Sequence, residues 1–417
     1  MTIIGAVRNR PISAVNEKLR SIYLMGPAFV AGVAYLDPGN VATNLTASSK
    51  YGYLLLWVIV AANLSAWLVQ YLASKFGIAT GKSLPELMGE RLTNRKLRIA
   101  YWAQAQLVAI ATDVAEIIGG ALALNILFAL PMMVGGLVTG FFSIAHLTLR
   151  ERGRERAFEF VILALVAITG IGFTAGLFVA PANTHAFING LAPRFADKES
   201  VLLAVSIFGA TIMPHAIYAH SALSRDRASG KLLATTKTNC LKATKWDVSL
   251  AMLIAGLINI GIFVIGAVNL YGHKVDNSII GAHNAISASL GVGFGMMFAI
   301  GLLASGIASS SVGTYASGVI TEGLLKIKMS FIEQRLIAII PALIIIWIAA
   351  DPTMALVLSQ VVLSLGIPFA LIPLIYLTSK SSVMGELKNK FRTKVIGYSV
   401  TAFLTLLNLT LLYLLIF

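Results

Sequence analysis

Cysteine and charged residues are both scarce in this sequence. The single cysteine, Cys240, excludes any disulfide bond within the chain. Charged residues make up only 12% of the 417 residues, whereas 57% are hydrophobic. A typical soluble domain carries about 25% charged residues. Negatively charged residues are fewer than positively charged ones, with 18 Asp and Glu against 32 Lys and Arg. A chain of this length with so little charge is expected to cross a membrane many times.

Eleven mostly apolar segments have approximately the 20 residues that a membrane-spanning helix needs. They cover residues 22–49, 52–77, 97–124, 130–149, 157–180, 199–223, 246–271, 282–324, 335–350, 354–378 and 393–416. No stretch between them suggests a separate soluble domain, and the basic N-terminus lacks the pattern of a cleaved signal peptide. The prediction is an all-α polytopic membrane protein with one transmembrane domain over residues 1–417.

Basic residues fall unevenly on the two sides that eleven crossings define. Counting the N-terminal tail and the loops in alternation puts 28 of the 32 Lys and Arg residues on one side and four on the other. Because positive charge collects in cytoplasmic loops, this asymmetry predicts a cytoplasmic N-terminus and an extracytoplasmic C-terminus. The same rule accounts for the net charge of +14, so no nucleic-acid partner is expected.

Three acidic residues are predicted to lie well inside apolar segments: Asp37, Asp113 and Glu116. A charge at the bilayer centre costs at least ~2.5–3.5 kcal/mol on insertion scales, so such residues are candidates for function. The alternative is a structural ion pair or a buried, protonated carboxyl group. Asp113 and Glu116 are three positions apart, which places them on one face of a helix.

Two of the eleven segments are predicted to be interrupted near mid-membrane. The first contains Asp37-Pro38-Gly39-Asn40, where proline removes a backbone donor and glycine permits unusual backbone angles. The sixth contains Pro214, which by itself is compatible with an ordinary proline kink. The two positions are equivalent if segments 1–5 (about 22–180) and 6–10 (about 199–378) are inverted repeats, a pattern that points to a midplane site in a transporter. Residues 393–416 would then form one extra C-terminal helix.

Residues at the two interruptions offer mixed ligands for a cation. Unwound backbone at membrane depth is tolerated where it lines a cavity or is buried in protein. Asp37 and Asn40 would supply side-chain oxygens, and Ala210, one turn before Pro214, a freed carbonyl. Met213 would add a thioether sulfur, which favours softer transition metals over Ca²⁺ and Mg²⁺. A methionine in a membrane helix more often serves packing, so its place beside the interruption is what favours a ligand role.

These motifs resemble the paired signatures of the NRAMP family, which are proton-coupled divalent metal transporters of the LeuT-type fold. The resemblance rests on DPGN at 37–40 and ATIMPH at 210–215, and it continues with TDVAEIIGG at 112–120 and LSQVVLSLGIPFALIPL at 358–374. The order and spacing of these segments agree along essentially the whole chain. Eleven spans with short tails are similar to the compact bacterial manganese transporters of that family.

The resemblance implies roles for particular residues. Metal would be bound by Asp37, Asn40, the Ala210 carbonyl and Met213, and Gln360 would join when the site closes. The proton route would include Asp113, Glu116, His215 and His220. The residues themselves support that route, because neighbouring carboxyl groups and imidazoles are suited to exchanging protons near neutral pH. The alternative for the two histidines is a structural, hydrogen-bonded role, which is also the interpretation favoured for His146.

The predicted function is import of Mn²⁺ and Fe²⁺ together with protons, by alternating access, across the cytoplasmic membrane of a bacterium. Expected partners are divalent metal ions, protons and the lipid bilayer, with no cofactor and no obligate protein partner. An alternative within the same architecture is a sodium-coupled transporter of a small organic solute, although Asp37 beside Met213 fits such a substrate poorly. An ion channel is disfavoured by the interrupted helices, and an enzyme by the lack of H-E-x-x-H, Walker and G-x-S-x-G motifs.

Overall fold

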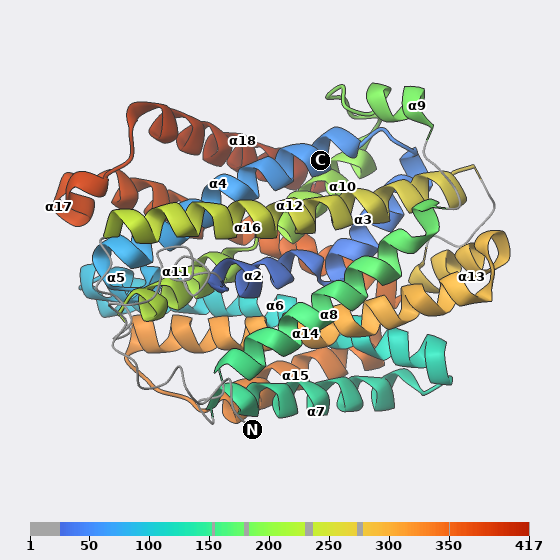
Figure 1. Cartoon of the computed structure of the whole chain (residues 1–417), viewed down its shortest axis with the longest axis horizontal. Helices are drawn as coiled ribbons and strands as arrows, with labels where there is room; N and C mark the ends of the chain where they lie inside the picture. The colour runs from blue at the N-terminus through green and yellow to red at the C-terminus, as the bar shows by residue number, and fades with distance from the viewer. Residues whose placement is uncertain are drawn as a thin grey trace, which may run out of the picture.

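The chain folds into a bundle of helices, of which the computed structural model describes residues 26–151, 155–178, 183–229, 237–272, 278–349 and 351–416 (Figure 1). Every regular element in this part is helical, as predicted. In chain order they are α2 (Pro27–Val33), η2 (Ala34–Leu36), α3 (Pro38–Tyr51), α4 (Leu56–Thr80), α5 (Leu84–Arg91), α6 (Arg95–Phe128), α7 (Met132–Glu151), α8 (Glu155–Thr174), η3 (Ala175–Phe178), α9 (Thr184–Asn189), α10 (Lys198–Thr211), α11 (Pro214–Ser229), α12 (Lys237–Asn269), α13 (Ile279–Leu290), α14 (Val292–Leu325), α15 (Phe331–Ile348), α16 (Pro352–Ser379), α17 (Ser381–Met384), η4 (Gly385–Leu387) and α18 (Phe391–Ile416).

Each of the eleven predicted apolar segments contains helix in the structure. Within the described residues, eight helical stretches are long and apolar enough to cross a membrane, and α2–η2 and α7 provide shorter apolar helices. Eleven crossings therefore remain a prediction. Residues 1–25, 152–154, 179–182, 230–236, 273–277, 350 and 417 lie outside the described part.

Several boundaries differ from the sequence expectation. The segment 282–324 is divided into α13 and α14 at Gly291, whose φ of 105° is a backbone conformation that glycine adopts readily. Between the second and third segments lies α5, which begins with a capping box between Ser83 and Glu86. α12 starts at Lys237, nine residues before the predicted apolar segment. The helix continues into polar first turns, which a run of apolar residues does not reveal.

Both predicted interruptions are present. The first segment is divided into α2–η2 and α3, with Asp37 in an extended conformation (φ −70°, ψ 161°) as the N-cap of α3 and Pro38 at the first helical position. The sixth segment is divided into α10, which ends at Thr211, and α11, which begins at Pro214. Two pairs of half-helices therefore meet inside the bundle.

Small residues allow α14 to pack closely against α6 and α8. A side-chain carbon at Gly306 would lie 3.0 Å from the Glu116 carbonyl oxygen and 3.2 Å from the Gly120 nitrogen. At Gly172 of α8, such an atom would lie 2.9 Å from the Cα of Gly301. α6 and α14 thereby form a closely packed core beside the two interrupted segments.

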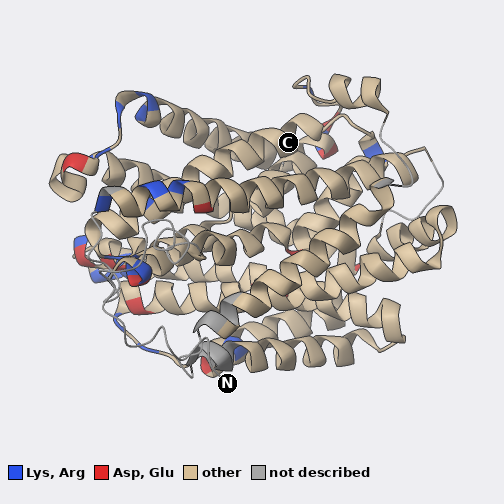
Figure 2. Cartoon of the chain, viewed as in Figure 1, with Lys and Arg blue, Asp and Glu red and all other residues tan. Residues whose placement is uncertain are grey.

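Basic residues gather at one end of the bundle, the left end in Figure 2, where α5, α17 and the first turns of α12 and α18 lie. The opposite end, which carries α9 and α13, has few. Arg335, the first residue of the predicted segment 335–350, is counted with the preceding loop in the sequence analysis but is 0% exposed inside α15. Its helix begins at residue 331, four positions earlier than the apolar segment suggests.

Candidate metal site and proton pathway

Asp37 lies where the first segment is interrupted, and its carboxylate is fully buried. One oxygen accepts a hydrogen bond from the Asn40 backbone N–H at 3.0 Å, and the other accepts one from the Gly39 N–H at 3.1 Å. Proline at position 38 leaves no competing donor there, since its nitrogen carries no hydrogen. The local sequence thus fixes the carboxylate at the N-terminus of α3, where the helix dipole favours negative charge.

Asn40 joins the two interruptions. Its amide nitrogen donates to the Ala210 carbonyl of α10 at 2.7 Å and to the Tyr35 carbonyl of η2 at 2.9 Å. The Tyr35 carbonyl also accepts from Asn259 of α12 at 3.0 Å. The Asn40 Oδ1 atom is buried and accepts no hydrogen bond within the described part of the chain. A carbonyl-type oxygen is thus left available beside the Asp37 carboxylate.

Gln360 reaches the same place from α16. Its Nε2 lies 3.4 Å from an Asp37 carboxylate oxygen and 3.0 Å from the Ser359 hydroxyl. Its Oε1 is buried and has no donor among the described residues. Glycine at position 39 leaves the space that the Gln360 amide occupies, because a side-chain carbon there would overlap it. α3 and α16 therefore approach each other directly at the candidate site.

Met213 occupies the gap between α10 and α11 and is fully buried. Its side chain belongs to a cluster with Val33 and Ala34 from the first interrupted segment and with Leu363 of α16, one turn after Gln360. Met213 therefore packs among residues of the first interrupted segment and of α16, the two parts of the chain that also provide contacts of the Asp37 carboxylate.

The five predicted metal-binding residues, Asp37, Asn40, Ala210, Met213 and Gln360, all have no exposed surface. Direct contacts link Asn40 to Ala210 and Gln360 to Asp37. Asp37 is the sole acidic member of this set, and the described residues contain no cluster of three or more His, Cys, Asp or Glu residues that could hold a metal. The set consists of one carboxylate, neutral oxygens and one sulfur, enclosed by protein.

Asp113 and Glu116 lie on the face of α6 that meets α14, and they have different surroundings. Asp113 accepts a hydrogen bond from Nη1 of the buried Arg335 at 2.6 Å, across 222 residues of sequence. Among the described residues, no nitrogen or hydroxyl donor reaches either oxygen of Glu116, whose polar neighbour is the Asp113 carboxyl group. Gly313 of α14 leaves room for both groups, because a side-chain carbon there would lie 3.3–3.4 Å from their oxygens. One carboxylate is paired with a cation and its neighbour is not.

The two histidines of α11 are buried, and each makes one polar contact. The Nδ1 of His215 lies 3.2 Å from the Thr112 hydroxyl, next to Asp113 in α6. The Nδ1 of His220 lies 2.7 Å from the Gln70 amide oxygen, and the amide nitrogen of Gln70 donates to the Tyr35 hydroxyl. The Nε2 atom of each ring has no partner within the described residues. His215 thus connects to the acidic pair, and His220 to the interrupted first segment.

Comparison with known proteins shows the family to which the chain belongs. A family profile described as Nramp, natural resistance-associated macrophage protein-like, matches residues 28–414. The chain belongs to the Nramp family. Among curated relatives, it is 52% identical over 394 residues to the divalent metal cation transporter MntH of Mycobacterium tuberculosis (strain CDC 1551 / Oshkosh), covering 94% of this chain and 92% of that protein. It is 43% identical over 408 residues to MntH of Bacillus subtilis (strain 168), covering 95% and 94%.

Solved structures agree with the Nramp assignment. The crystal structure of the Eremococcus coleocola manganese transporter, in complex with an aromatic bis-isothiourea substituted compound, matches with a TM-score of 0.83 at 31% identity. That match covers 94% of this chain and 86% of the other. Mhp1, a nucleobase-cation-symport-1 family transporter, matches with a TM-score of 0.55 at 14% identity, which concerns the fold alone. The predicted family and the LeuT-type fold are confirmed, and the chain is a multi-pass membrane transporter.

Sequence reasoning missed three buried residues of this Nramp chain that contact the candidate site residues or their neighbours: Arg335, Gln70 and Asn259. The local sequence does indicate the burial of one of them, Arg335. Ser330 and Glu333 form a capping box, and this pattern places a helix start at residue 331 and hence Arg335 inside α15. Gln70 and Asn259 are single amides in apolar helices, and their own surroundings in the sequence do not distinguish them.

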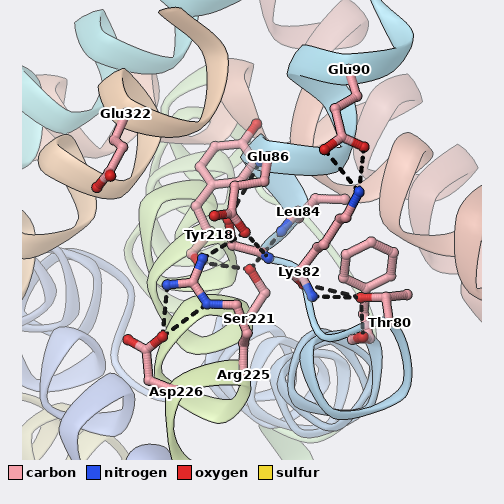
Figure 3. Close-up of polar contacts among 12 residues, drawn as sticks. Thr80, Lys82, Leu84, Glu86, Glu90, Tyr218, Ser221, Arg225, Asp226 and Glu322 are labelled. Carbon is pink, nitrogen blue, oxygen red and sulfur yellow. Dashed lines mark hydrogen bonds and ion pairs between the residues drawn. The ribbon is translucent and has the colours of Figure 1, made fainter. Parts of the chain in front are cut away.

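Polar contacts join neighbouring helices at both ends of the Nramp bundle. At the basic end, Arg225 of α11 lies between Glu86 of α5 and Asp226, with an N–O distance of 2.5 Å to Glu86 (Figure 3). The Leu84 backbone N–H of α5 donates to the Ser221 hydroxyl at 2.9 Å. At the opposite end, the Tyr51 hydroxyl donates to Asp197 at 2.6 Å. Each half of the second interrupted segment is thus tied to a neighbouring element.

Proposed function

We propose that this Nramp chain imports divalent transition-metal ions, chiefly Mn²⁺ and also Fe²⁺, together with protons. One observation carries the proposal: the Asp37 carboxylate, the unpartnered Asn40 Oδ1, the Ala210 carbonyl and the Gln360 amide converge, fully buried, between two interrupted helices. Half-helices that meet at mid-bundle are where transporters of this architecture bind their substrates. The curated relatives named divalent metal cation transporters support the same assignment.

The donor set favours a transition metal. Mn²⁺ and Fe²⁺ accept carboxylate and carbonyl oxygens, and Met213 would add a sulfur that Ca²⁺ and Mg²⁺ do not prefer. The fold alone would not decide the substrate, since it is shared with a nucleobase-cation symporter. A buried site with one carboxylate and several neutral donors suits a small divalent cation better than a sodium-coupled organic solute.

Proton coupling is assigned to the residues around Asp113. His215 contacts Thr112, and Asp113 is paired with Arg335, while Glu116 accepts no hydrogen bond from a donor group in the described residues. A carboxyl group that is not hydrogen-bonded to a cation can bind a proton and release it as the neighbouring charges change. We assign His220 to the same route through Gln70. We assign the chain no enzymatic activity, no cofactor and no obligate protein partner.

The membrane would be the cytoplasmic membrane of a bacterium. The end that collects Lys and Arg is placed in the cytoplasm, with the N-terminus inside and the C-terminus outside (Figure 2). We treat the chain as one transmembrane domain with inverted repeats over about 22–180 and 199–378, followed by the extra helix α18. Alternating access would then expose the Asp37 site to each side in turn.

Uptake by reconstituted vesicles tests the proposal. Proteoliposomes with the purified chain should accumulate radioactive Mn²⁺, faster with an inward proton gradient, and an internal pH dye should report acidification in parallel. An inward sodium gradient at equal pH should have no effect. Proteoliposomes with Asp37→Asn serve as the matched control. Uptake driven by sodium, or equal uptake by the parent and Asp37→Asn, would overturn the assignment.

A further inference from the structure

One side of α4 carries an apolar stripe that ends in a lysine. Leu64, Leu68, Tyr71 and Lys75 are spaced at i, i+4, i+7 and i+11, which puts them on one helix face. Leu64 is 67% exposed, Leu68 and Tyr71 are partly exposed, and Trp67 stacks on Tyr71 with ring centroids 6.4 Å apart. Eleven residues of helix span about 16 Å, close to half the hydrocarbon thickness of a bilayer. The stripe therefore has the length of one lipid leaflet.

Lys75 ends this stripe at the basic end of the bundle, and no carboxylate in the described part of the chain forms an ion pair with it. It is only 9% exposed, and its Nζ donates to Asn389 Oδ1 at 3.1 Å. Asn389 is held in turn by Thr378, through contacts of 2.9 and 2.7 Å. Lys390 directly follows Asn389 in the sequence and adds a second positive charge near Lys75. In the described part of the chain, neither lysine has a carboxylate within ion-pair distance.

The flanking helices add cations and interfacial aromatic residues. α4 lies between α12 and α18 in Figure 1, and basic residues mark the same end of both helices in Figure 2. On α18, Phe391 is 80% exposed and is followed by Arg392 and Lys394. On α12, Trp246 is 75% exposed beside Lys245. Tryptophan at such a position is typical of the membrane–water interface.

We propose that this surface binds an anionic phospholipid of the inner leaflet. Its phosphate would lie between Lys75 and Lys390, and an acyl chain would follow the stripe from Tyr71 to Leu64. Neither lysine has a carboxylate partner in the described part of the chain, so an anion would neutralise both charges, and the apolar stripe that begins beside them favours an anion that carries a hydrocarbon chain. Basic pockets between helices at the cytoplasmic side are known to select such headgroups. The proposal is independent of which ion the protein carries.

Lipid titration of the purified full-length chain, followed by native mass spectrometry, tests this site. The parent should bind phosphatidylglycerol more tightly than phosphatidylcholine. Lys75→Gln/Lys390→Gln should weaken phosphatidylglycerol binding about 30-fold, and Lys390→Gln alone, which changes an exposed residue, about fivefold. Affinity for phosphatidylcholine should be unchanged. The matched control is Arg95→Gln/Lys96→Gln, which removes two cations from the same end and should change the affinity less than twofold.

Three results would overturn the proposal. An equal loss of phosphatidylglycerol binding in the control variant would mean that surface charge, and not this site, attracts the lipid. Unchanged binding in Lys390→Gln and in the double variant would exclude the site itself. A third arm adds soluble glycerol phosphate, which lacks the acyl chains. If it displaces phosphatidylglycerol at equal concentration, the site is one for free phosphate and the lipid assignment is wrong.

Discussion

Asp37 has two separable properties at the scale of a single residue. Its carboxylate is the sole acidic group among the candidate ligands, and it also caps α3 through the Gly39 and Asn40 N–H groups. Loss of an N-cap costs about 0.5–2 kcal/mol of stability. A change to alanine removes the cap and the charge together, whereas asparagine is an equally good cap without charge. The pair of variants therefore separates folding from binding.

Asp37→Asn is expected to remain folded and to lose Mn²⁺ binding, because a neutral site cannot offset the desolvation of a divalent ion. Asp37→Ala should lose binding and also unfold at lower temperature. Calorimetric titration with Mn²⁺ and a thermal melt of each variant give the two readouts. An Mn²⁺ affinity for Asp37→Asn within twofold of the parent would remove Asp37 from the ligand set.

Met213 allows a similar separation of sulfur from volume. Met213→Ala removes the sulfur but also leaves a buried cavity, which costs about 2–5 kcal/mol, whereas Met213→Leu keeps the volume. If the sulfur contacts the ion, both variants should transport Mn²⁺ moderately less well and Cd²⁺ much less well, and Ca²⁺ and Mg²⁺ should inhibit them more strongly. Competition assays of Mn²⁺ uptake measure this. A Met213→Leu variant with the selectivity of the parent would show that Met213 only packs.

The sequence revealed the candidate ligands but not the residues that hold them. Asp37 and Asn40 were predictable because a proline and a glycine between them mark the interruption, and Met213 because it precedes Pro214. Their partners come from distant parts of the chain: Asn259 is 224 residues from Tyr35, and Gln70 is 150 residues from His220. No local pattern encodes such contacts, since they depend on how the helices pack.

At the scale of elements, α6 and α15 are joined by a fully buried ion pair between Asp113 and Arg335. Removing one partner of such a pair leaves an uncompensated charge and costs about 3–5 kcal/mol. Glu116, which receives no such hydrogen bond, should be replaceable at much lower cost. The two carboxyl groups of α6 are therefore distinguishable by stability as well as by proton coupling.

Asp113→Asn should lower the melting temperature, and Asp113→Asn/Arg335→Gln should recover most of that loss, because the second change removes the stranded cation. Glu116→Gln should melt like the parent. All three should alter proton uptake and the pH dependence of Mn²⁺ transport more than Mn²⁺ affinity. Thermal melts and parallel recordings of metal and proton flux provide the data. Proton flux that is the same as the parent's in every variant would make these carboxyl groups structural.

The contact between α5 and α11 is the second element-scale feature with a measurable consequence. Partial burial would raise the pKa of Glu86, but the Ser83 backbone N–H and the Arg225 guanidinium outweigh it and hold the pKa below its ordinary value. Because the pKa of Glu86 is lowered, its ion pair with Arg225 stabilises the contact between α5 and α11 at neutral pH. That stabilisation is lost only as the pH falls below about 4.3, the usual value for Glu.

Glu86→Gln should therefore loosen α5 without changing how transport depends on pH between 5 and 8. A partly exposed ion pair contributes about 0.2–1 kcal/mol, so hydrogen exchange over residues 84–91 should become up to about fivefold faster. Lys82→Gln, which breaks the exposed pair with Glu90, is the matched control and should have a smaller effect. A pH profile displaced by Glu86→Gln would mean that this group, and not the α6 pair, sets the pH dependence.

Element boundaries were predictable to the extent that apolar runs coincide with helices. The runs located every long helix, but they could not show that α13 and α14 separate at Gly291, because both sides of that glycine are apolar. They also missed α5, whose mean composition is polar, although Ser83 and Glu86 give its start. Composition locates membrane helices, whereas their ends depend on caps and backbone conformation.

At the scale of the whole molecule, the gathering of basic residues at one end predicts its orientation. A reporter enzyme that is active only outside the cytoplasm should be active when fused after Phe417 and inactive when inserted into residues 230–236. α18 supports this arrangement, since it starts beside Lys390 at the basic end and ends at Ile416. Activity of the reporter in the 230–236 loop would reverse the topology.

The ion pair between α6 and α15 also has a consequence for biosynthesis. Asp113 and Arg335 are 222 residues apart, and a ribosome that adds 5–20 residues per second needs about 11–44 s to make the chain between them. During that time α6 enters the bilayer without its counter-ion, although an unpaired charge in a membrane helix is costly. The ion pair that stabilises a helix from the first third of the chain is therefore completed only by a residue made in the last third.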